Sequence, residues 1–336
     1  MLARLASASL RGLDAEAVDV EVDLSRGIPC WSLVGLPEAA VREARDRVRS
    51  SVINSGFEFP LRRITVNLSP ADMRKDGSYF DLPIAIGLLM ASGQIQLDNA
   101  LKLSSSASVS QNESKLPFLI GELALDGRIN PVNGVLPLVL FARSHGFQSI
   151  ILPTDNINEV AAIDDIQIYP AANLLTVVEH LTGFKAIEQA YFETDDTQIS
   201  ENIPDMCDVR GQQQARRALE IAAAGGHHLL LNGSPGVGKS MLAKRLPGIM
   251  PPLTSEQALE VTRIYSVSGD RSRPAMSKLP PIRTPHHTAS NVAIIGGGSN
   301  PKPGEISKAD FGILFLDELP TFQYYQYSNQ DRQYAG

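Results

Sequence analysis

Eight consecutive residues in the second half of the chain have the types and spacing of a phosphate-binding loop: Gly233, Ser234, Pro235, Gly236, Val237, Gly238, Lys239 and Ser240. Glycines at these positions let backbone N–H groups close around a phosphate chain. We expect Lys239 to reach the β- and γ-phosphates of a nucleotide and the Ser240 hydroxyl to bind Mg²⁺. The sequence therefore predicts a nucleotide site.

The residues around this loop predict the elements that must position it. His228 to Asn232 is short and apolar and is predicted to be a strand, whereas Ser240 to Leu246 is predicted to be helical. A strand, a glycine loop and a helix in this order aim backbone N–H groups and a helix N-terminus at a phosphate. The alternative is a glycine-rich turn that fits the pattern by chance.

A second stretch could supply the acids that phosphate chemistry needs. Gly312 to Leu316 is apolar and is followed by Asp317 and Glu318. This pattern is typical of a buried parallel strand with carboxylates at its C-terminal end, where ligands bind in open α/β sheets. We expect Asp317 to hold Mg²⁺ through its water shell, and Glu318 to orient or deprotonate the attacking water as a general base.

Length and composition limit the kind of protein. The 336 residues suffice for about two domains. A net charge of −7 argues against adhesion to DNA by bulk charge, although a local basic surface remains open. Cys30 and Cys207 lack metal-ligand spacing and suit a reducing compartment. Since no apolar run is long enough to span a bilayer, we expect a cytoplasmic protein with no membrane partner.

The first 183 residues predict an α/β domain. Strands are expected at 18–24, 63–68, 118–123, 149–153 and 166–169, and helices at 38–54, 82–90, 136–145 and 174–181. On the first of these helices the apolar stripe consists of Val41, Ala44, Val48 and Val52. Another face of the same helix carries three arginines and either faces solvent or contacts a nucleic acid: Arg42, Arg45 and Arg49.

Within this domain, Lys75-Asp76-Gly77 and the run from Gly121 to Val132 resemble the proteolytic domain of Lon proteases. The resemblance implies a Lon-protease-like fold of the ribosomal S5 type, and Lon proteases use a Ser–Lys dyad. Overlaying the motifs puts Asp81 at the position of the Ser and Leu136 at that of the Lys. Neither can perform this chemistry, and no Lys or His has a motif-based claim to partner the nearby Ser78. We therefore expect a catalytically inert scaffold or binding platform.

The long segment between the two phosphate motifs carries further patterns. A helix is expected from Thr254, which has Gln257 three residues on, to Ile264. The adjacent His286 and His287 lack further metal ligands at suitable spacing. Three runs resemble the magnesium-chelatase-like AAA+ proteins of the ComM/YifB family: Arg283 to Ser290, Gly296 to Ser307, and Gly312 to Pro320. The resemblance covers roughly residues 1–322, and the chain departs from the family pattern at Ile282, Lys308, Asp310 and Thr321.

This resemblance implies an α/β chain with an inert Lon-protease-like domain at 1–183, an acidic linker at 184–206 and a partial P-loop AAA+ domain at 207–322. A helix is expected within 208–224, and the adenine contact of such ATPases would lie near Val209 and Gly211. Family members resemble hexameric ATP-driven motors that act on DNA, including branch migration during natural transformation. The implied cofactors are ATP and Mg²⁺, and the implied partners are single-stranded or branched DNA and further copies of the chain.

Two other functions compete with the DNA motor. The first is a chelatase motor subunit that helps insert Mg²⁺ into a porphyrin; the Lon-like domain in front is not expected of such subunits. The second is a non-enzymatic binding module whose ATPase half is vestigial. DNA binding, porphyrin metallation and nucleotide-independent binding by residues 1–183 would separate the three.

The composition changes after Phe322. Residues 323–336 contain four of the eight tyrosines and lack Leu, Ile and Val. From the family resemblance we expect a leucine-rich helix here, followed by a sensor strand, an arginine finger and a helical lid. We therefore expect an aberrant, frameshifted tail, with a deliberately short paralogue as the alternative. Such a chain would bind nucleotide and hardly hydrolyse it.

Overall fold

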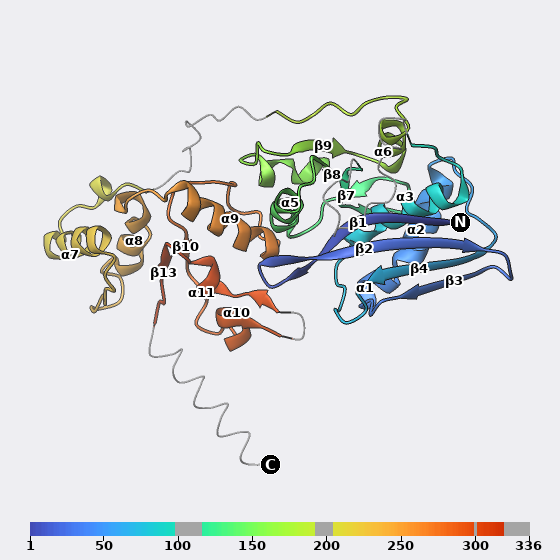
Figure 1. Ribbon diagram of the computed structural model, residues 1–336. Helices are drawn as coiled ribbons and strands as arrows, with labels where there is room; N and C mark the ends of the chain where they lie inside the picture. Colours follow the sequence, from blue (N-terminus) through green and yellow to red (C-terminus); the bar gives the residue numbers. More distant parts are fainter. Residues whose placement is uncertain (98–115, 192–203, 299–300, 319–336) are drawn as a thin grey trace, which may run out of the picture. The chain divides into compact units, whose positions relative to one another are not determined.

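The protein is described by a computed structural model covering residues 1–97, 116–191, 204–298 and 301–318. It has an α/β architecture and divides into two compact units, Met1–Glu193 and Thr194–Gly336 (Figure 1). The division falls inside the acidic segment 184–206, and the tail at 323–336 lies outside the described residues. Within the described ranges, no helix is both long enough and apolar enough to traverse a bilayer.

The first unit is built on a four-stranded sheet. Its strands in chain order are β1 (Leu2–Arg11), β2 (Asp14–Ser25), β3 (Cys30–Val34) and β4 (Arg63–Ser69). They are ordered β1-β2-β4-β3 in the sheet; β2 is antiparallel to β1 and β4, whereas β3 is parallel to β4. The predicted alternation along β2 is confirmed, because every second residue from Val18 to Leu24 is buried.

Two smaller sheets complete the strands of this unit. β5 (Phe118–Leu119), β8 (Ser149–Pro153) and β9 (Gln167–Ala171) are parallel, and β6 (Glu122–Leu123) forms an antiparallel pair with β7 (Ile129–Asn130). The single strand predicted at 118–123 was wrong, since the chain changes sheets at Gly121. A Cβ at Gly121 would lie 2.7 Å from Cγ2 of Ile129, so a larger residue would force the neighbouring side chains to shift at this close crossing.

Helices cover the strands of the first unit. Their bounds are α1 (Ala39–Arg42), α2 (Ala44–Asn54), α3 (Asp81–Ser92), α5 (Val135–Ser144) and α6 (Leu174–Leu181). Both α3 and α5 pack against β1 and β2, and α2 packs against α3 (Figure 1). α3 is almost wholly buried, as its apolar sequence predicts. These contacts form the main core of the unit.

The single helix predicted at 38–54 was wrong in one respect, because it is interrupted at Glu43. Its apolar stripe is confirmed: Val41, Ala44, Val48 and Val52 are fully buried. The carbonyl of Ala40 accepts a hydrogen bond of 2.8 Å from Nη2 of Arg47. In an unbroken helix that carbonyl would accept from the N–H of Ala44. The side chain of Arg47 therefore competes with the helical hydrogen bond at the interruption.

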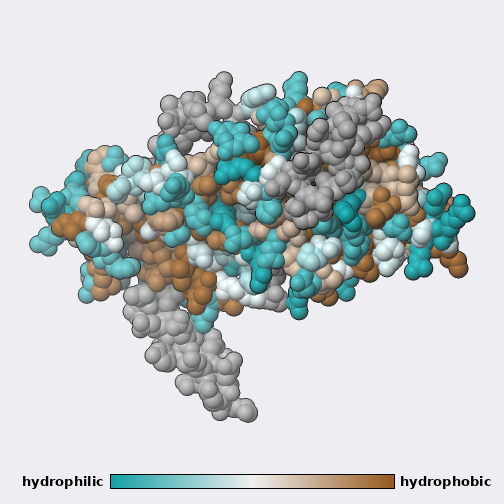
Figure 2. All heavy atoms as spheres, viewed as in Figure 1, coloured by the Kyte–Doolittle hydropathy of each residue, from teal (hydrophilic) through white to brown (hydrophobic). Residues whose placement is uncertain are grey.

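The second unit has short elements around small apolar clusters. Its helices are α7 (Gln213–Gly225), α8 (Lys239–Ala243), α9 (Ser255–Ser268), α10 (Asn291–Ile295) and α11 (Glu305–Lys308). Its strands are β10 (Ile282–Arg283), β11 (Gly296–Gly297), β12 (Lys302–Pro303) and β13 (Ile313–Leu314). The capping box predicted for Thr254 and Gln257 is confirmed, with α9 extending to Ser268. Hydrophobic side chains reach the surface of this unit, including Leu230, Val292 and Ile295 (Figure 2 shows hydrophobic residues in brown).

Two strands predicted in the second unit differ from the structure. Residues 228–232 are not a strand, and Leu230 is 76% exposed. The predicted strand at 312–316 is only two residues long, and its residues are half-buried. It is parallel, as expected, and pairs with β10. Backbone groups need a ladder partner to form a strand, and β10 and β13 offer only two residues each among the described residues.

Candidate nucleotide-binding site

The predicted phosphate loop lies immediately before α8. Gly236 and Gly238 have φ angles of 82° and 93°, in the left-handed region that other residues rarely adopt. Lys239 and Ser240 are the first two residues of α8, which is shorter than the predicted helix 240–246 and continues as a 3₁₀ turn at Leu246–Ile249. The glycines therefore turn the chain so that Lys239 and Ser240 follow the loop directly.

Lys239 lies against its own loop. Its Nζ donates hydrogen bonds of 2.7 Å to the carbonyl of Gly233 and 3.0 Å to that of Ser234. The side chain thus spans from the end of the loop back to its beginning. A phosphate oxygen entering the loop would offer this ammonium a charged acceptor in place of neutral carbonyls, which makes the stronger hydrogen bond.

Ser240 and Asp317 meet, although they are 77 positions apart. The Ser240 hydroxyl donates a hydrogen bond of 2.8 Å to Oδ2 of Asp317, and Oδ1 of Asp317 accepts from the N–H of Glu318 at 3.1 Å. A hydroxyl and a carboxylate are hard oxygen donors of the kind Mg²⁺ prefers. Because Mg²⁺ usually keeps several waters and phosphate oxygens, one such pair suits a nucleotide-bound magnesium. Ser240 and Asp317 are therefore suitable ligands for a nucleotide-bound Mg²⁺.

Glu318 follows Asp317 in a left-handed conformation, with φ of 55°. Its side chain is 64% exposed, and Oε2 lies 3.8 Å from Nδ1 of His287. His287 comes from the segment after β10, and its ring lies 4.1 Å from that of His286. Sequence reasoning weighed these histidines as metal ligands and included them in the Arg283–Ser290 run, but did not predict a contact with Glu318. The contact between His287 and Glu318 could have been predicted only from the position of the histidines after β10, the strand that pairs with β13.

The residues expected near adenine lie at the start of α7. Val209 is buried with Met206, Leu219 and Leu242, and its carbonyl accepts a hydrogen bond of 3.4 Å from Nη1 of Arg216. Gly211 is exposed and has a φ angle of 71°. The next residue, Gln212, joins this segment to the phosphate loop, because its Nε2 donates to the carbonyl of Val237 at 3.4 Å. Sequence reasoning did not identify Gln212.

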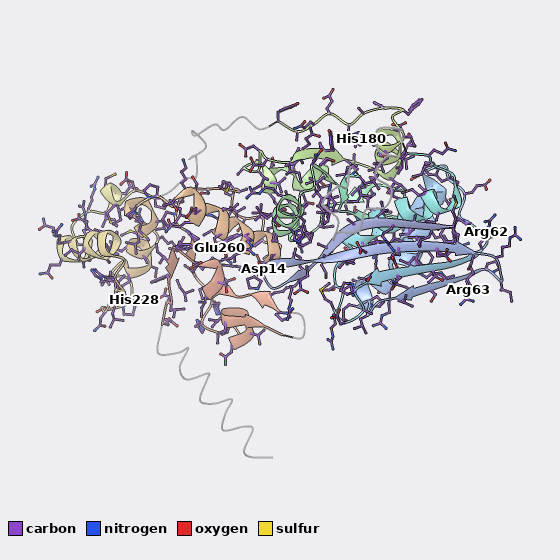
Figure 3. The ribbon with its side chains drawn as sticks, viewed as in Figure 1. Asp14, Arg62, Arg63, His180, His228 and Glu260 are labelled. Atoms are coloured by element: carbon purple, nitrogen blue, oxygen red, sulfur yellow. The ribbon has the colours of Figure 1, made fainter. Side chains whose placement is uncertain are left out.

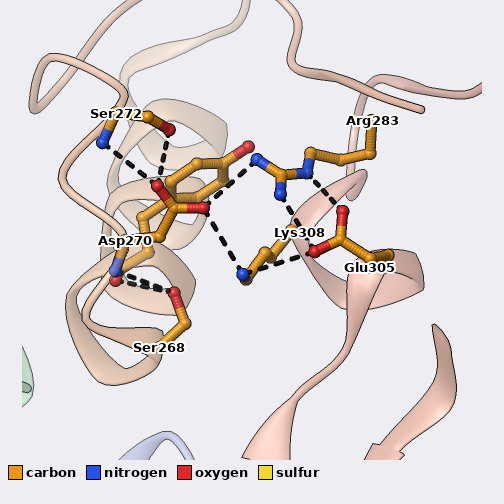
Figure 4. Close-up of polar contacts among 7 residues, drawn as sticks. Ser268, Asp270, Ser272, Arg283, Glu305 and Lys308 are labelled. Atoms are coloured by element: carbon orange, nitrogen blue, oxygen red, sulfur yellow. Dashed lines mark hydrogen bonds and ion pairs between the residues drawn. The ribbon is translucent and has the colours of Figure 1, made fainter. Parts of the chain in front are cut away.

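An ion-pair network supports β10, the partner strand of β13 (Figure 4). Arg283 donates from Nε and Nη2 to the two carboxylate oxygens of Glu305, at 2.6 and 2.9 Å, and from Nη1 to Asp270 at 3.2 Å. Lys308 contacts both acids at 3.4 Å. Burial alone would raise the pKa values of Asp270 and Glu305, but Arg283 and Lys308 lower both, and Ser272 also lowers that of Asp270, so both pKa values lie below their usual range. Lys308, interpreted from the sequence as a departure from the family pattern, thus has a structural role in this network.

In the first unit, the two positions that the sequence overlay assigned to the Lon dyad, Asp81 and Leu136, are filled by groups with other partners. The carboxylate of Asp81 is almost fully buried and accepts from Arg47 and from the N–H of Leu123. Leu136 is 1% exposed within α5. Nearby, the hydroxyl of Ser78 donates to Oε2 of Glu122. Neither Arg47 nor Glu122 was given a role from the sequence: Arg47 lies outside the motifs, and Glu122 was considered only as part of the Gly121–Val132 run.

Comparison with known proteins identifies two matching family models and several similar proteins. A family model described as magnesium chelatase, subunit ChlI, matches residues 205–328, and a second, subunit ChlI of Mg-chelatase, matches residues 20–156. Competence protein ComM of Haemophilus influenzae is 44% identical over 325 residues, which are 96% of this chain and 61% of the relative. Uncharacterized protein YifB of Salmonella typhimurium is 46% identical over 312 residues, 93% of this chain and 58% of the relative.

A more distant match is limited to part of the chain. Lon protease of Rhizobium meliloti is 26% identical over 149 residues, covering 42% of this chain and 16% of that protein. The chain spans about 60% of the length of the ComM and YifB relatives. The first family model spans the stretches that contain Lys239 and Asp317, and the second lies wholly within the first unit. The chain therefore belongs to the magnesium-chelatase-like AAA+ family that includes the ComM and YifB proteins.

Proposed function

We propose that this chain binds ATP with Mg²⁺ and serves as a subunit of an ATP-driven motor that acts on single-stranded or branched DNA, assembled as a homo-hexamer. One observation carries the nucleotide part of the proposal: Ser240 Oγ and Asp317 Oδ2 lie 2.8 Å apart. The two stretches that contribute them are distant in the sequence, and their meeting supports a magnesium site beside the phosphate loop.

Each residue then has a defined task. The loop from Gly233 to Gly238 surrounds the phosphates with backbone N–H groups, and Lys239 contacts the β- and γ-phosphates. Ser240 and Asp317 hold Mg²⁺, which when bound neutralises charge on the phosphate oxygens. Glu318 orients or deprotonates the attacking water. Adenine lies against the backbone near Val209 and Gly211.

We further propose that the chain binds ATP more readily than it hydrolyses it. The side chain of Glu318 is 64% exposed, so it lies in water rather than in an enclosed site. Electrostatic and general-base effects are strongest where water is excluded. Phosphate release with and without branched DNA measures this directly, and DNA-stimulated turnover at the ordinary enzymatic rate of about 1 per second or more would contradict it.

The nucleotide part is tested by titrating a fluorescent ATP analogue with and without Mg²⁺. The unaltered chain should bind more tightly with Mg²⁺, and Asp317→Asn should reduce binding to the level that the unaltered chain shows in EDTA. Lys239→Ala should weaken binding about tenfold or more, since it removes a charged hydrogen bond. Lys244→Ala, an exposed lysine in the following turn, is the matched control. Binding by Asp317→Asn that still responds fully to Mg²⁺ would refute the assignment.

The choice of DNA as the substrate is supported by the names of the relatives. The Haemophilus protein that matches 96% of this chain is a competence protein, which favours DNA over a porphyrin. The chelatase function is favoured only by the description of the family models. A gel-shift assay with forked DNA and a porphyrin metallation assay give opposite results for the two functions.

A further inference from the structure

One end of the main sheet of the first unit carries arginines and stacked aromatic rings. β2 ends at Ser25 and β3 begins at Cys30, and both pair with Arg63, the first residue of β4. The loop after β2 and the segment before β4 therefore meet at this end. We call the following six residues the basic–aromatic patch: Arg26, Trp31, Arg49, Phe59, Arg62 and Arg63.

The aromatic part of the patch is held together by measured contacts. The rings of Trp31 and Phe59 are stacked, with centroids 6.2 Å apart and an interplanar angle of 24°. The guanidinium carbon of Arg49 lies 5.9 Å from the centroid of Phe59, within the range of a cation–π contact. Trp31 and Phe59 are half-buried, whereas Arg49 is exposed. A guanidinium plane on an aromatic ring offers a surface for a further flat group.

The arginines of the patch are exposed and available. Arg62 and Arg63 are seen at this end of the sheet in Figure 3. In the described part of the chain, none of the four arginines makes an ion pair, whereas Arg4, Arg11 and Arg128 elsewhere in the unit do. Residues 25–31 and 57–63 together contain three arginines and one acid, Glu58. In a chain of net charge −7, the patch is a local concentration of positive charge.

We propose that the basic–aromatic patch binds single-stranded DNA. The guanidinium groups of Arg26, Arg62 and Arg63 would contact successive phosphates, and an unpaired base would stack on the Arg49–Phe59–Trp31 assembly. A duplex offers phosphates but hides its base faces, so the aromatic part favours a single strand. Exposed apolar side chains beside the patch, Ile28 at 87% and Leu61 at 82%, suit contact with bases.

The choice of DNA rather than RNA rests on the function proposed above. Binding of a single strand by the patch does not depend on that function. The surface lies in the first unit and involves no residue of the nucleotide site. Binding is therefore expected without ATP, and a Lys239→Ala variant should bind the strand as well as the unaltered chain does. Failure of the ATPase proposal and failure of this one can thus be told apart.

The test uses two readouts on the full chain without nucleotide. Anisotropy of a labelled oligothymidine gives the affinity and its dependence on salt. Trp31 is the single tryptophan of the chain, so its fluorescence reports from inside the patch. We expect the Trp31 fluorescence to be quenched as the oligothymidine binds, because a base would stack against the Arg49–Phe59–Trp31 assembly.

The decisive variant is Arg62→Ala/Arg63→Ala, and the matched control is Arg11→Ala/Arg128→Ala, which removes the same charge from exposed positions elsewhere in the unit. Loss of two phosphate contacts should weaken binding about tenfold or more and reduce the slope of log affinity against log salt by roughly 1.4. The control should change affinity less than about twofold, apart from the general effect of charge.

Each of the following outcomes would overturn the proposal. The first is equal weakening by the two double variants, which would show bulk charge rather than a site. The second is binding without any change in Trp31 fluorescence, or stronger binding to oligouridine than to oligothymidine. The third is a change of oligomeric mass in Arg62→Ala/Arg63→Ala with unchanged DNA affinity, which would make the patch a contact between copies of the chain.

Discussion

Arg47 holds Asp81 by two hydrogen bonds, of 2.6 Å from Nε to Oδ2 and 3.0 Å from Nη2 to Oδ1. The same guanidinium donates to the carbonyl of Ala40, where the helix is interrupted. Burial raises the pKa of Asp81 to about 6, although Arg47 acts in the opposite direction. Asp81, which the sequence overlay put at the position of a protease nucleophile, is therefore engaged in an ion pair that joins α2 to α3.

Replacing Arg47 by alanine should destabilise the first unit. The change leaves the carboxylate of Asp81 buried without its cation, and breaking a buried pair in this way costs about 3–5 kcal/mol. Arg45→Ala, an exposed arginine of the same helix, is the control and should change stability by less than about 0.5 kcal/mol. Urea unfolding followed by Trp31 fluorescence measures both. Equal stability of the two variants would show that the pair does not support the fold.

The same carboxyl group should make stability depend on pH. Its pKa is raised to about 6 in the folded protein, so folding binds a proton as the pH falls below that value. Unfolding free energy should therefore rise relative to Asp81→Asn by roughly 2 kcal/mol from about pH 7 to about pH 4.5. The measurement is the urea midpoint of both chains across this range. A difference that stays constant with pH would contradict the raised pKa.

Glu318 and His287 should affect turnover rather than binding. Glu318→Gln keeps the size of the side chain but removes its basicity, so ATP binding should persist while phosphate release falls about 100-fold or more from whatever rate the unaltered chain shows. His287→Ala removes the partner 3.8 Å from Oε2 and should alter phosphate release with little change in affinity. His286→Ala is the control for the neighbouring ring. A loss of affinity in His287→Ala would instead place that residue in nucleotide binding.

Arg283 should stabilise the strand pair beside the nucleotide site. Arg283→Ala leaves Asp270 and Glu305, 18% and 19% exposed, without their principal cation. The expected loss is roughly 2–4 kcal/mol, below the value for a fully buried pair because of this exposure. Lys308→Leu should reduce stability by about 1 kcal/mol or less, since Lys308 makes only one contact with each acid, at 3.4 Å, and these contacts are longer than those of Arg283.

Hydrogen exchange reports this change locally. The amides of Ile313 and Phe315 donate to the carbonyls of Pro281 and Arg283, both at 2.8 Å, and should lose protection in Arg283→Ala. The lowered pKa values of Asp270 and Glu305 add a pH test with the opposite sign to that of Asp81. Their contribution is present above about pH 4 and is lost as the pH falls further. Unchanged exchange in Arg283→Ala would exclude the network from supporting β10.

The sequence predicted the parts of this molecule that depend on local patterns. The capping box at Thr254, the buried stripe of α2 and the alternation along β2 follow from neighbouring residues alone. The approach of Ser240 to Asp317 was expected because both belong to one phosphate-binding pattern.

Features that depend on distant partners could not be predicted in the same way. The helix break at Glu43 depends on the direction taken by the Arg47 side chain. The apolar residues 228–232 resemble a strand, but strand formation requires neighbouring backbone, which local sequence does not specify. The contact between His287 and Glu318 arises from the pairing of β10 with β13 and has no pattern of its own.

The pairing of β10 with β13 also connects the β11–β12 hairpin to the residues that follow β13. The β11–β12 hairpin leads directly into α11, whose Glu305 holds Arg283 of β10 by two hydrogen bonds. β10 is aligned with β13, and the chain then continues to Asp317 and Glu318. One guanidinium thus connects the hairpin to the strand pair that leads to Asp317 and Glu318, and we expect a displacement of the hairpin to reach these two acids by this route. Since Asp317 is one hydrogen bond from Ser240, a shift of about 1 Å along this path is enough to separate them.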